Sequence, residues 1–355
     1  MFTLQIGNEK RTFEQIRVGE KPIQHKAWQF CHDWLNGQTD FVLHTSGSTG
    51  KPKPIEITRK QMEASAKSTI QALGLIENDN FLVCINTDFI GGKMMLVRGL
   101  ELGANLVVIE PSGNPLQFIE PNSQFDFMAV VPLQLENILS QSPEKKAVLN
   151  QMKAIIVGGA PVGKKLEQKI QLLKSPVFST YGMTETISHI ALKRLNGNEK
   201  SDCFQSLPNV EISQDERGCL AIQSEITKNE VIITNDLVEL ISPTEFRWLG
   251  RVDNIINSGG IKIQLEELES EIEQILLGLE INCQFAICPI PDEKLGQKIV
   301  LFLELKSLSD EIFSELTSTM GNQLGKYRNP KETRFQTTFP LTASGKIDRK
   351  KLVVK

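Results

Sequence analysis

The stretch AIIVGGAPVGKKLEQKIQLL, residues 154–173, decides the fold class of this 355-residue chain. Its first residues are apolar and suit a buried strand, a glycine-rich turn follows, and from residue 163 the apolar side chains recur at helical spacing. Further strand-like runs occupy residues 41–44, 81–85, 105–109, 127–131 and 176–179, and helix-like segments include residues 59–73 and 92–102. This alternation predicts an α/β domain in which helices cover a parallel or mixed sheet.

The pattern changes towards the C-terminus. Residues 231–251 alternate apolar and polar side chains between turn residues, which is typical of hairpins. After Asp253 a Gly-Gly turn, an acidic amphipathic helix and short strands form a unit of their own. We therefore expect a large N-terminal α/β domain, residues 1–252, with mixed sheets and a small β-rich subdomain. A small mobile α+β domain, residues 253–355, is expected to follow it.

Composition argues against several classes of protein. The 39 Lys and Arg nearly balance the 43 Asp and Glu, so the basic excess of a nucleic-acid-binding protein is missing. The six cysteines include no C-x-x-C pair, which favours reduced thiols. No export signal is visible, and no apolar run approaches the 18 or so residues that would cross a bilayer. We expect a soluble cytoplasmic protein without nucleic-acid partners or membrane insertion.

A loop rich in Gly, Ser and Thr directly follows the strand-like run at residues 41–44. It reads HTSGSTGKPKP over residues 44–54, and its glycines, hydroxyls and lysines suit a polyphosphate. It is not a Walker A motif, because Gly47 and Gly50 are too close together and Pro52 follows Lys51. The alternative is a mobile polar surface loop.

A second glycine loop, residues 158–165, nearly has the Walker spacing. Lys165 stands where that motif needs Ser or Thr to bind Mg²⁺. We therefore predict a strand-to-helix turn beside a bound nucleotide and not a Walker site.

Three further motifs follow these loops in order. They read YGMTE over residues 181–185, LGRVDNIINSGG over residues 249–260 and PLTASGKIDR over residues 340–349. Together with the Ser/Thr/Gly loop, they resemble the superfamily of adenylate-forming acyl-CoA synthetases, adenylation domains and luciferases. The resemblance covers roughly Thr45 to Arg349 and implies ATP, Mg²⁺ and coenzyme A as cofactor and co-substrates, with a small-molecule carboxylate as substrate.

The resemblance also implies individual roles. The residues that match its pyrophosphate loop are Thr45, Ser46, Gly47, Ser48, Thr49, Gly50 and Lys51. Those that match the walls of the adenine and acyl pockets are Gly159, Ala160, Pro161, Tyr181 and Gly182, with Tyr181 against adenine. Those that match ribose and phosphate contacts are Asp236, Arg251 and Thr184. Glu185 matches the Mg²⁺ ligand, and a carboxylate is a donor that Mg²⁺ prefers.

The C-terminal residues carry roles that depend almost wholly on the resemblance. Asp253 matches a hinge between domains, and Lys346 matches a catalytic lysine that reaches the α-phosphate and the substrate carboxylate. Ser258, Gly259 and Gly260 match the face beside the tunnel for the pantetheine thiol. Plainer alternatives are a helix-capping Glu185, an Asp253 that pairs with Arg251, and a solvated terminus around Lys346.

The chain departs from the superfamily pattern in places. Asn235 stands where Gly is usual, His44 replaces an aromatic residue and Pro54 replaces Gly. Only 44 residues precede Thr45, whereas well over a hundred are usual, so we expect much of the N-terminal subdomain to be missing.

The substrate is indicated by residues 87–104. Gly91 and Gly92 lie in a helix-like segment that matches the acyl-pocket helix, and Arg98 is its unusual member. An arginine at the pocket rim could bind a second substrate carboxylate with two parallel hydrogen bonds, or it could cover the surface of the helix. A segment ending R-x-L-x-x-G-A is similar to the o-succinylbenzoyl-CoA synthetases of menaquinone biosynthesis, whose substrate is an aromatic dicarboxylate.

Three alternatives stay open at this point. The chain could ligate another carboxylate, transfer the acyl group to a carrier-protein thiol, or be a truncated, non-catalytic nucleotide-binding module. The sequence does not define the oligomeric state, and a homodimer is a common arrangement.

Overall fold

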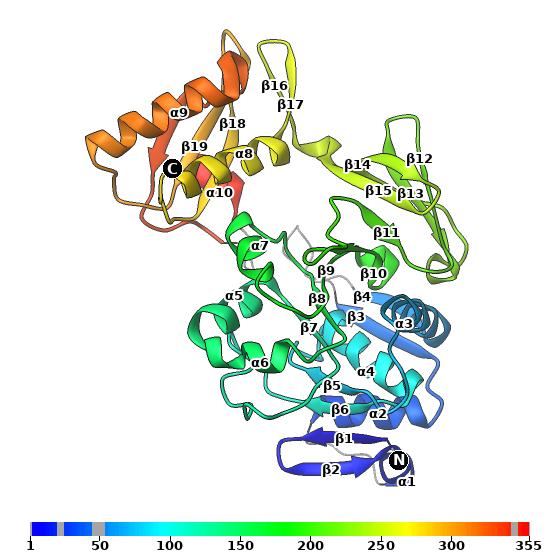
Figure 1. The fold of residues 1–355 in the computed structure, drawn as a ribbon. Coiled ribbons are helices and arrows are strands. Elements are labelled where there is room, and N and C mark those ends of the chain that lie inside the picture. Colours follow the sequence, from blue (N-terminus) through cyan, green and yellow to red (C-terminus); the bar gives the residue numbers. More distant parts are fainter. Residues whose placement is uncertain (1, 20–24, 45–53, 342–346, 355) are drawn as a thin grey trace.

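The computed structural model describes residues 2–19, 25–44, 54–341 and 347–354. Within this part of the chain, thirteen strands form one mixed sheet in the order β12-β13-β14-β15-β11-β10-β9-β8-β7-β5-β6-β1-β2 (Figure 1). The N-terminal strands are β1 (Thr3–Ile6), β2 (Glu9–Thr12), β5 (Asn80–Val83), β6 (Asn105–Val108), β7 (Phe127–Val130), β8 (Ala154–Val157) and β9 (Val177–Gly182). The later ones are β10 (His189–Arg194), β11 (Phe204–Ser206), β12 (Val210–Gln214), β13 (Cys219–Ser224), β14 (Ile232–Ser242) and β15 (Glu245–Arg251).

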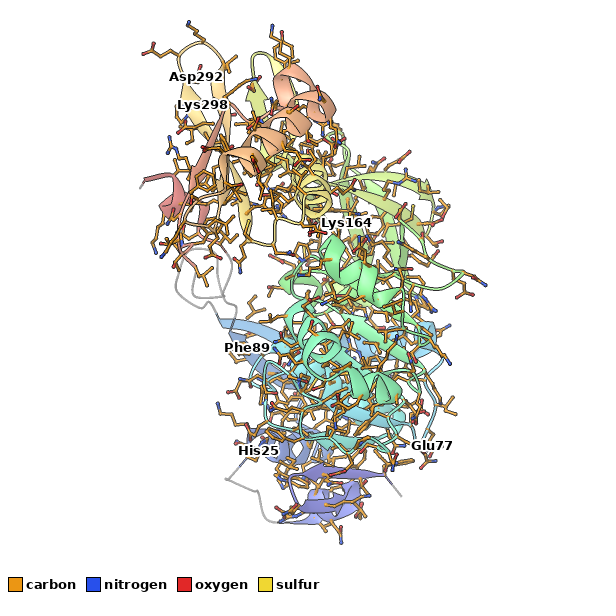
Figure 2. All side chains as sticks on the ribbon, turned by 60° about the vertical axis from the view of Figure 1, so that its left-hand side comes forward. His25, Glu77, Phe89, Lys164, Asp292 and Lys298 are labelled. Atoms are coloured by element: carbon orange, nitrogen blue, oxygen red, sulfur yellow. The ribbon has the colours of Figure 1, made fainter. Side chains whose placement is uncertain are left out.

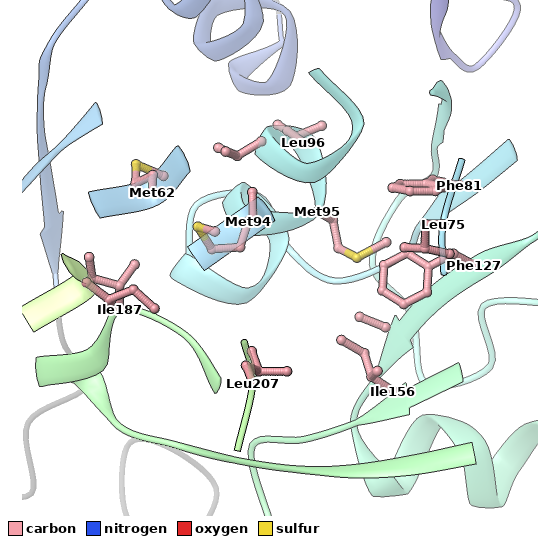
Figure 3. Packing of buried hydrophobic residues seen from close by; sticks show 14 of the residues in the cluster. Met62, Leu75, Phe81, Met94, Met95, Leu96, Phe127, Ile156, Ile187 and Leu207 are labelled. Atoms are coloured by element: carbon pink, nitrogen blue, oxygen red, sulfur yellow. The ribbon is translucent and has the colours of Figure 1, made fainter. Parts of the chain in front are cut away.

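The centre of this sheet is parallel and is covered on both faces. Alternate residues of β5 point to opposite sides, so Phe81 joins one hydrophobic cluster and Leu82 the other. On the first face lie α2 (Lys26–Leu35), α3 (Arg59–Leu73) and α4 (Ile90–Leu102); Figure 3 shows Met62 and Met94 packed there. On the second face lie α5 (Pro132–Gln141), α6 (Lys146–Leu149) and α7 (Lys164–Ile170). This arrangement confirms the predicted α/β class.

Strand order changes direction next to β5. From β5 the chain passes through α4 to β6 on one side, and β7, β8 and β9 then follow on the other side. Loops at the carboxyl ends of parallel strands diverge at such a reversal and leave a crevice for ligands. The fold therefore directs the residues after β5, β7, β8 and β9 to one place.

The C-terminal region forms a second sheet. Its strands are β16 (Ile255–Ser258), β17 (Ile261–Gln264), β18 (Phe285–Asp292), β19 (Gly296–Leu303) and β20 (Glu332–Phe335). One face packs on α8 (Leu265–Gly278) and α9 (Asp310–Arg328), and the other on α10 (Arg349–Val354). These residues form hydrophobic clusters separate from those of the main sheet, and Figure 1 shows the region beside α7.

The N-terminal part differs from the sequence-based expectation. Residues 41–44 do form a strand, but β3 (Asp40–His44) pairs antiparallel with β4 (Pro54–Thr58) in a separate two-stranded sheet. Before it, β1, β2 and α1 (Phe13–Val18) were not predicted, and β1 extends the main sheet by pairing with β6. No helix in the described ranges is both long and apolar enough to span a bilayer.

Candidate active site

A large cavity of about 1230 Å³ lies at the carboxyl ends of the parallel strands. Residues 129–131, 158–164 and 179–185 form its floor and one wall, as the strand order predicts. Strands β14 and β15 close a second side with Asp236 and Arg251. The opposite wall belongs to the C-terminal region and includes Glu266, Glu269 and Ser270 of α8.

Asp236 is the centre of a polar cluster on the cavity wall. Only 6% of Asp236 is exposed, and its carboxylate accepts hydrogen bonds from three side chains. Tyr181 Oη donates to Oδ2 over 2.7 Å, while Trp248 Nε1 and Arg251 Nη1 donate to Oδ1 over 3.2 and 3.3 Å. Asp236 and Arg251 lie close together because they pair across strands β14 and β15. The cluster presents fixed polar groups beside an aromatic ring.

The environment keeps Tyr181 protonated. Burial, followed by the negative charge of Asp236, raises the pKa of the Tyr181 hydroxyl well above its ordinary value. The ring packs edge-on against Phe246 with centroids 5.2 Å apart. Tyr181 is therefore a fixed hydrogen-bond donor with a defined ring orientation.

The turns that carry the predicted nucleotide residues lie in this cavity. Gly159, Ala160 and Pro161 line it in the turn after β8, and Gly159 adopts a φ of 84°, which favours glycine. Thr184 and Glu185 line it from the 3₁₀ turn η2 (Thr184–Thr186).

Gly182 shows why a glycine is needed at the end of β9. It lines the cavity, and a Cβ atom there would collide with the backbone of Ser188 and His189. This close approach brings residue 188 to the cavity wall.

Arg98 is a buried cation on the wall of the cavity. Only 1% of the residue is exposed, and its Nη2 donates to Ser188 Oγ over 2.9 Å. Its buried Nε has no hydrogen-bond partner among the described residues, and no described acidic side chain forms an ion pair with it. Burial lowers the pKa of the Arg98 guanidinium to about 9, so it is still charged at neutral pH. A buried, uncompensated charge of this kind is costly unless a ligand pairs with it.

Gly91 and Gly92, the two glycines predicted to contact the substrate, have different surroundings in the structure. Gly91 lines the cavity. Gly92 does not line it among the described residues, because it faces the turn after β5, where a Cβ would overlap the backbone of Asn86 and Ile85. Gly92 therefore packs closely against backbone, and its predicted substrate contact stays a prediction.

Contacts between the two regions close part of the cavity. The backbone N–H of Lys164, at the start of α7, donates to Glu273 of α8 over 3.0 Å, and Figure 2 labels Lys164 where these helices meet. One turn earlier on α8, the Glu269 carboxylate accepts a hydrogen bond from Arg349. Burial raises the pKa of both carboxyls, although hydrogen bonds from Arg349 and Lys164 oppose this.

Other predicted residues lie elsewhere. Ser258 ends β16, and Gly259 and Gly260 form the turn to β17. These three residues lie outside the cavity wall, and Gly259 lies against the Tyr327 ring. Asp253 accepts hydrogen bonds from Arg251 and Asn235 over 3.0 and 3.1 Å.

Several predicted residues cannot be placed. Lys346 and the whole pyrophosphate loop, Thr45, Ser46, Gly47, Ser48, Thr49, Gly50 and Lys51, lie outside the described residues.

Sequence reasoning missed several residues of the cavity. Trp248 pairs with Val238, two residues after Asp236 in β14, so a hairpin alignment could have indicated that it lies close to Asp236. Ser188 and His189 come only two residues after the YGMTE motif, so their position in the sequence could have indicated them. The acidic residues of α8 gave no such signal.

Family models match most of the chain. The AMP-binding enzyme model matches residues 13–220, and the model of the AMP-binding enzyme C-terminal domain matches residues 271–346. The chain belongs to the AMP-binding enzyme family. Membership in this family confirms the adenylate-forming resemblance that the ordered motifs predicted.

Two curated relatives of this chain carry the same name. A 2-succinylbenzoate–CoA ligase of Lactococcus lactis is 28% identical over 99% of this chain and 79% of its own length. An Enterococcus faecalis protein of the same name is 26% identical over 95% of this chain and 75% of its own.

Solved structures of the family show the same fold. An acyl-CoA synthetase (AMP-forming)/AMP-acid ligase II-like protein from Dyadobacter fermentans is 42% identical, with a TM-score of 0.65 over 96% of this chain and 97% of that one. The o-succinylbenzoate CoA synthetase of Bacillus subtilis, in complex with its acyl-adenylate, is 24% identical, with a TM-score of 0.70 over 88% of this chain and 68% of that one.

Proposed function

We propose that this AMP-binding enzyme converts 2-succinylbenzoate, ATP and coenzyme A into 2-succinylbenzoyl-CoA, AMP and pyrophosphate. The observation that carries the proposal is Arg98, a buried guanidinium on the cavity wall without an acidic partner among the described residues. A dicarboxylate supplies that partner with one carboxylate and leaves the other for activation. The name of the two curated relatives, 2-succinylbenzoate–CoA ligase, supports the same substrate.

ATP would occupy the cavity beside the Asp236 cluster. We propose that adenine lies against the Tyr181 ring and that Asp236 and Arg251 hold the ribose hydroxyls. Tyr181, Trp248 and Arg251 orient the Asp236 carboxylate, so it is ready to accept from hydroxyls without rearrangement. Thr184 and the loop residues 45–51 would contact the phosphates.

Glu185 would hold Mg²⁺. It is an exposed carboxylate on the cavity wall, and Mg²⁺ is commonly bound by one or two carboxylates together with substrate phosphates. When bound, the ion would neutralise charge on the phosphates of ATP.

The reaction divides into two half-reactions. A substrate carboxylate oxygen attacks the α-phosphorus of ATP, the bond to pyrophosphate breaks, and acyl-AMP forms. The coenzyme A thiol then loses its proton, its sulfur attacks the acyl carbonyl, and AMP leaves with the electron pair of the anhydride bond. Adenylation makes AMP, in place of oxide, the leaving group of the second step.

A change of domain arrangement would separate these steps. We propose that Lys346 serves the first half-reaction and that rotation about Asp253 brings Ser258, Gly259 and Gly260 to the cavity for the second. In the present arrangement Asp253 pairs with Arg251 and the β16–β17 turn lies off the cavity wall, so the hypothesis requires these contacts to change.

The proposal also includes a cytoplasmic location and a homodimeric assembly. A reducing cytoplasm would suit the cysteines, which form no disulfide in the described structure. A homodimer stays a prediction from the sequence, to be measured by light scattering.

The experiment that tests the function is ATP–pyrophosphate exchange with a panel of acids. The panel contains 2-succinylbenzoate and two monocarboxylates that each lack one of its carboxylates. We expect strong exchange with the dicarboxylate and weak exchange with either monocarboxylate. Equal exchange with a monocarboxylate would reject the proposed role of Arg98, and exchange only with an unrelated acid would reject the substrate.

A further inference from the structure

A series of polar side chains, buried except for the half-buried Ser188, connects Arg98 to helix α3. Arg98 Nη2 donates to Ser188 Oγ over 2.9 Å, and Ser188 Oγ lies 3.4 Å from His189 Nδ1. His189 Nε2 lies 3.1 Å from Thr69 Oγ1, which in turn donates to the Ser65 carbonyl over 3.1 Å. Thr69 is fully buried and His189 is 6% exposed.

The direction of each hydrogen bond between Arg98 and Thr69 is assigned from the two ends of the series. Thr69 has one hydroxyl proton and gives it to the Ser65 carbonyl, so it must accept from His189 Nε2–H. His189 Nδ1 then has a free lone pair and accepts from the Ser188 hydroxyl. Ser188 Oγ keeps its own lone pairs for Arg98, which can only donate.

The backbone beside Ser188 is strained, which indicates that the position of Ser188 is functionally important. Ile187 has a φ of 64°, which is rare for a β-branched residue. The Ser188 N–H donates to the Thr186 carbonyl over 2.6 Å, so Ile187 is the centre of a strained γ-turn. This turn fixes Ser188 between Arg98 and His189, and Figure 3 shows Ile187 among the buried side chains of this region. Strain of this kind is concentrated at functional sites.

We propose that Thr69 and His189 are positioning residues that orient Arg98, through Ser188, towards the second carboxylate of the substrate. The inference rests on the proposed function for its substrate and extends it to residues that act through others. Thr69 does not line the cavity among the described residues, so its effect on substrate binding must pass through His189.

The protonation state of His189 follows from its surroundings. Burial and the nearby positive charge of Arg98 lower its pKa well below the ordinary value. A neutral His189 keeps the lone pair that Ser188 needs and leaves Arg98 as the cation at this end of the cavity.

The first test compares KM values for substrate and for ATP. Thr69→Val removes the acceptor for His189 and should raise the KM for 2-succinylbenzoate about three- to tenfold, with the KM for ATP unchanged. Thr69→Ser keeps the hydroxyl and should restore the KM for 2-succinylbenzoate. Ser68→Ala is the matched control, because it removes a buried hydroxyl of the same helix that donates to Pro208 instead. It should lower stability without changing either KM.

Several outcomes would overturn the inference. An unchanged KM for 2-succinylbenzoate in Thr69→Val, or an equal rise in both KM values, would leave Thr69 a structural residue only. The same rise in Ser68→Ala would show that loss of stability, and not the series of side chains to Arg98, causes the effect.

The second test needs no substrate. Nitrogen-15 NMR of histidine-labelled protein should show His189, identified by the signal lost in His189→Asn, with a proton on Nε2 and none on Nδ1 at pH 7. A proton on Nδ1 would overturn the inference. A wild-type enzyme that fails to use 2-succinylbenzoate would instead reject the proposed function and leave this NMR result valid, so the two failures are distinct.

Discussion

Replacement of Arg98 by methionine should weaken substrate use and stabilise the protein at the same time. Methionine is unbranched and uncharged, so it replaces the aliphatic part of the arginine side chain without the guanidinium. Truncation of one partner of a buried, hydrogen-bonded charge pair costs about 2 to 5 kcal/mol. Because about 1.4 kcal/mol is a factor of ten, kcat/KM for 2-succinylbenzoate should fall about 30-fold to 5,000-fold.

The expected stabilisation distinguishes a binding residue from a structural one. In the free enzyme Arg98 is a buried cation without an acidic partner among the described residues, and burial has already lowered its pKa to about 9. Replacing buried charges by apolar groups often raises stability by about 1 to 4 kcal/mol. Urea unfolding should therefore give a higher midpoint for Arg98→Met than for the wild type.

The assays are ATP–pyrophosphate exchange over a range of substrate concentrations and urea unfolding without ligand. Arg59→Met is the matched control, because Arg59 pairs with Glu63 over 2.6 Å and stacks on Trp34. It should lower stability and leave both KM values unchanged. An Arg98→Met protein with wild-type kcat/KM for 2-succinylbenzoate, or with lower stability and equal losses for all acids, would refute the reasoning.

Three further predictions test other parts of the site. Tyr181→Phe removes the hydroxyl that donates to Asp236 over 2.7 Å and should raise the KM for ATP about tenfold in the exchange assay; an unchanged KM would contradict the cluster's role in ATP binding. Gly92→Ala should lower the free energy of unfolding by about 2 kcal/mol or more, because its Cβ meets backbone, whereas Gly91→Ala should be tolerated; equal losses would refute the packing argument. Below pH 6.5 His189 gains a proton in the unfolded state but stays neutral in the folded state. The free energy of unfolding of the wild type should therefore fall by about 1.4 kcal/mol more per pH unit than that of His189→Asn. Parallel pH profiles of urea unfolding for the two proteins would contradict this.

Much of the fold could be predicted from local patterns. The strand, turn and helix of residues 154–173 appear as β8 and α7, although α7 ends earlier, at Ile170. The apolar run of each central strand is long enough to identify it as buried on both faces. The place of β3 could not be predicted in this way, because pairing with β4 depends on a partner across the loop and not on the strand's own composition.

Motifs indicated some of the residues that line the cavity, but they could not indicate contacts between elements that are distant in sequence. Motif matching identified Tyr181 and Asp236, and the structure joins them by a hydrogen bond although they are 55 residues apart. The contact of His189 with Thr69 spans 120 residues and depends on how α3 packs against the sheet, which no local pattern encodes. Gly91 and Gly92 differ because neighbouring positions on a helix face different directions.

Direct detection of the product tests the central claim most directly. Purified wild-type enzyme should be mixed with 2-succinylbenzoate, ATP, Mg²⁺ and coenzyme A, and the mixture should be analysed by mass spectrometry. We predict 2-succinylbenzoyl-CoA and AMP in equal amounts, with no thioester when ATP is omitted. AMP-forming activity with another acid, and no thioester from 2-succinylbenzoate, would contradict the proposed function.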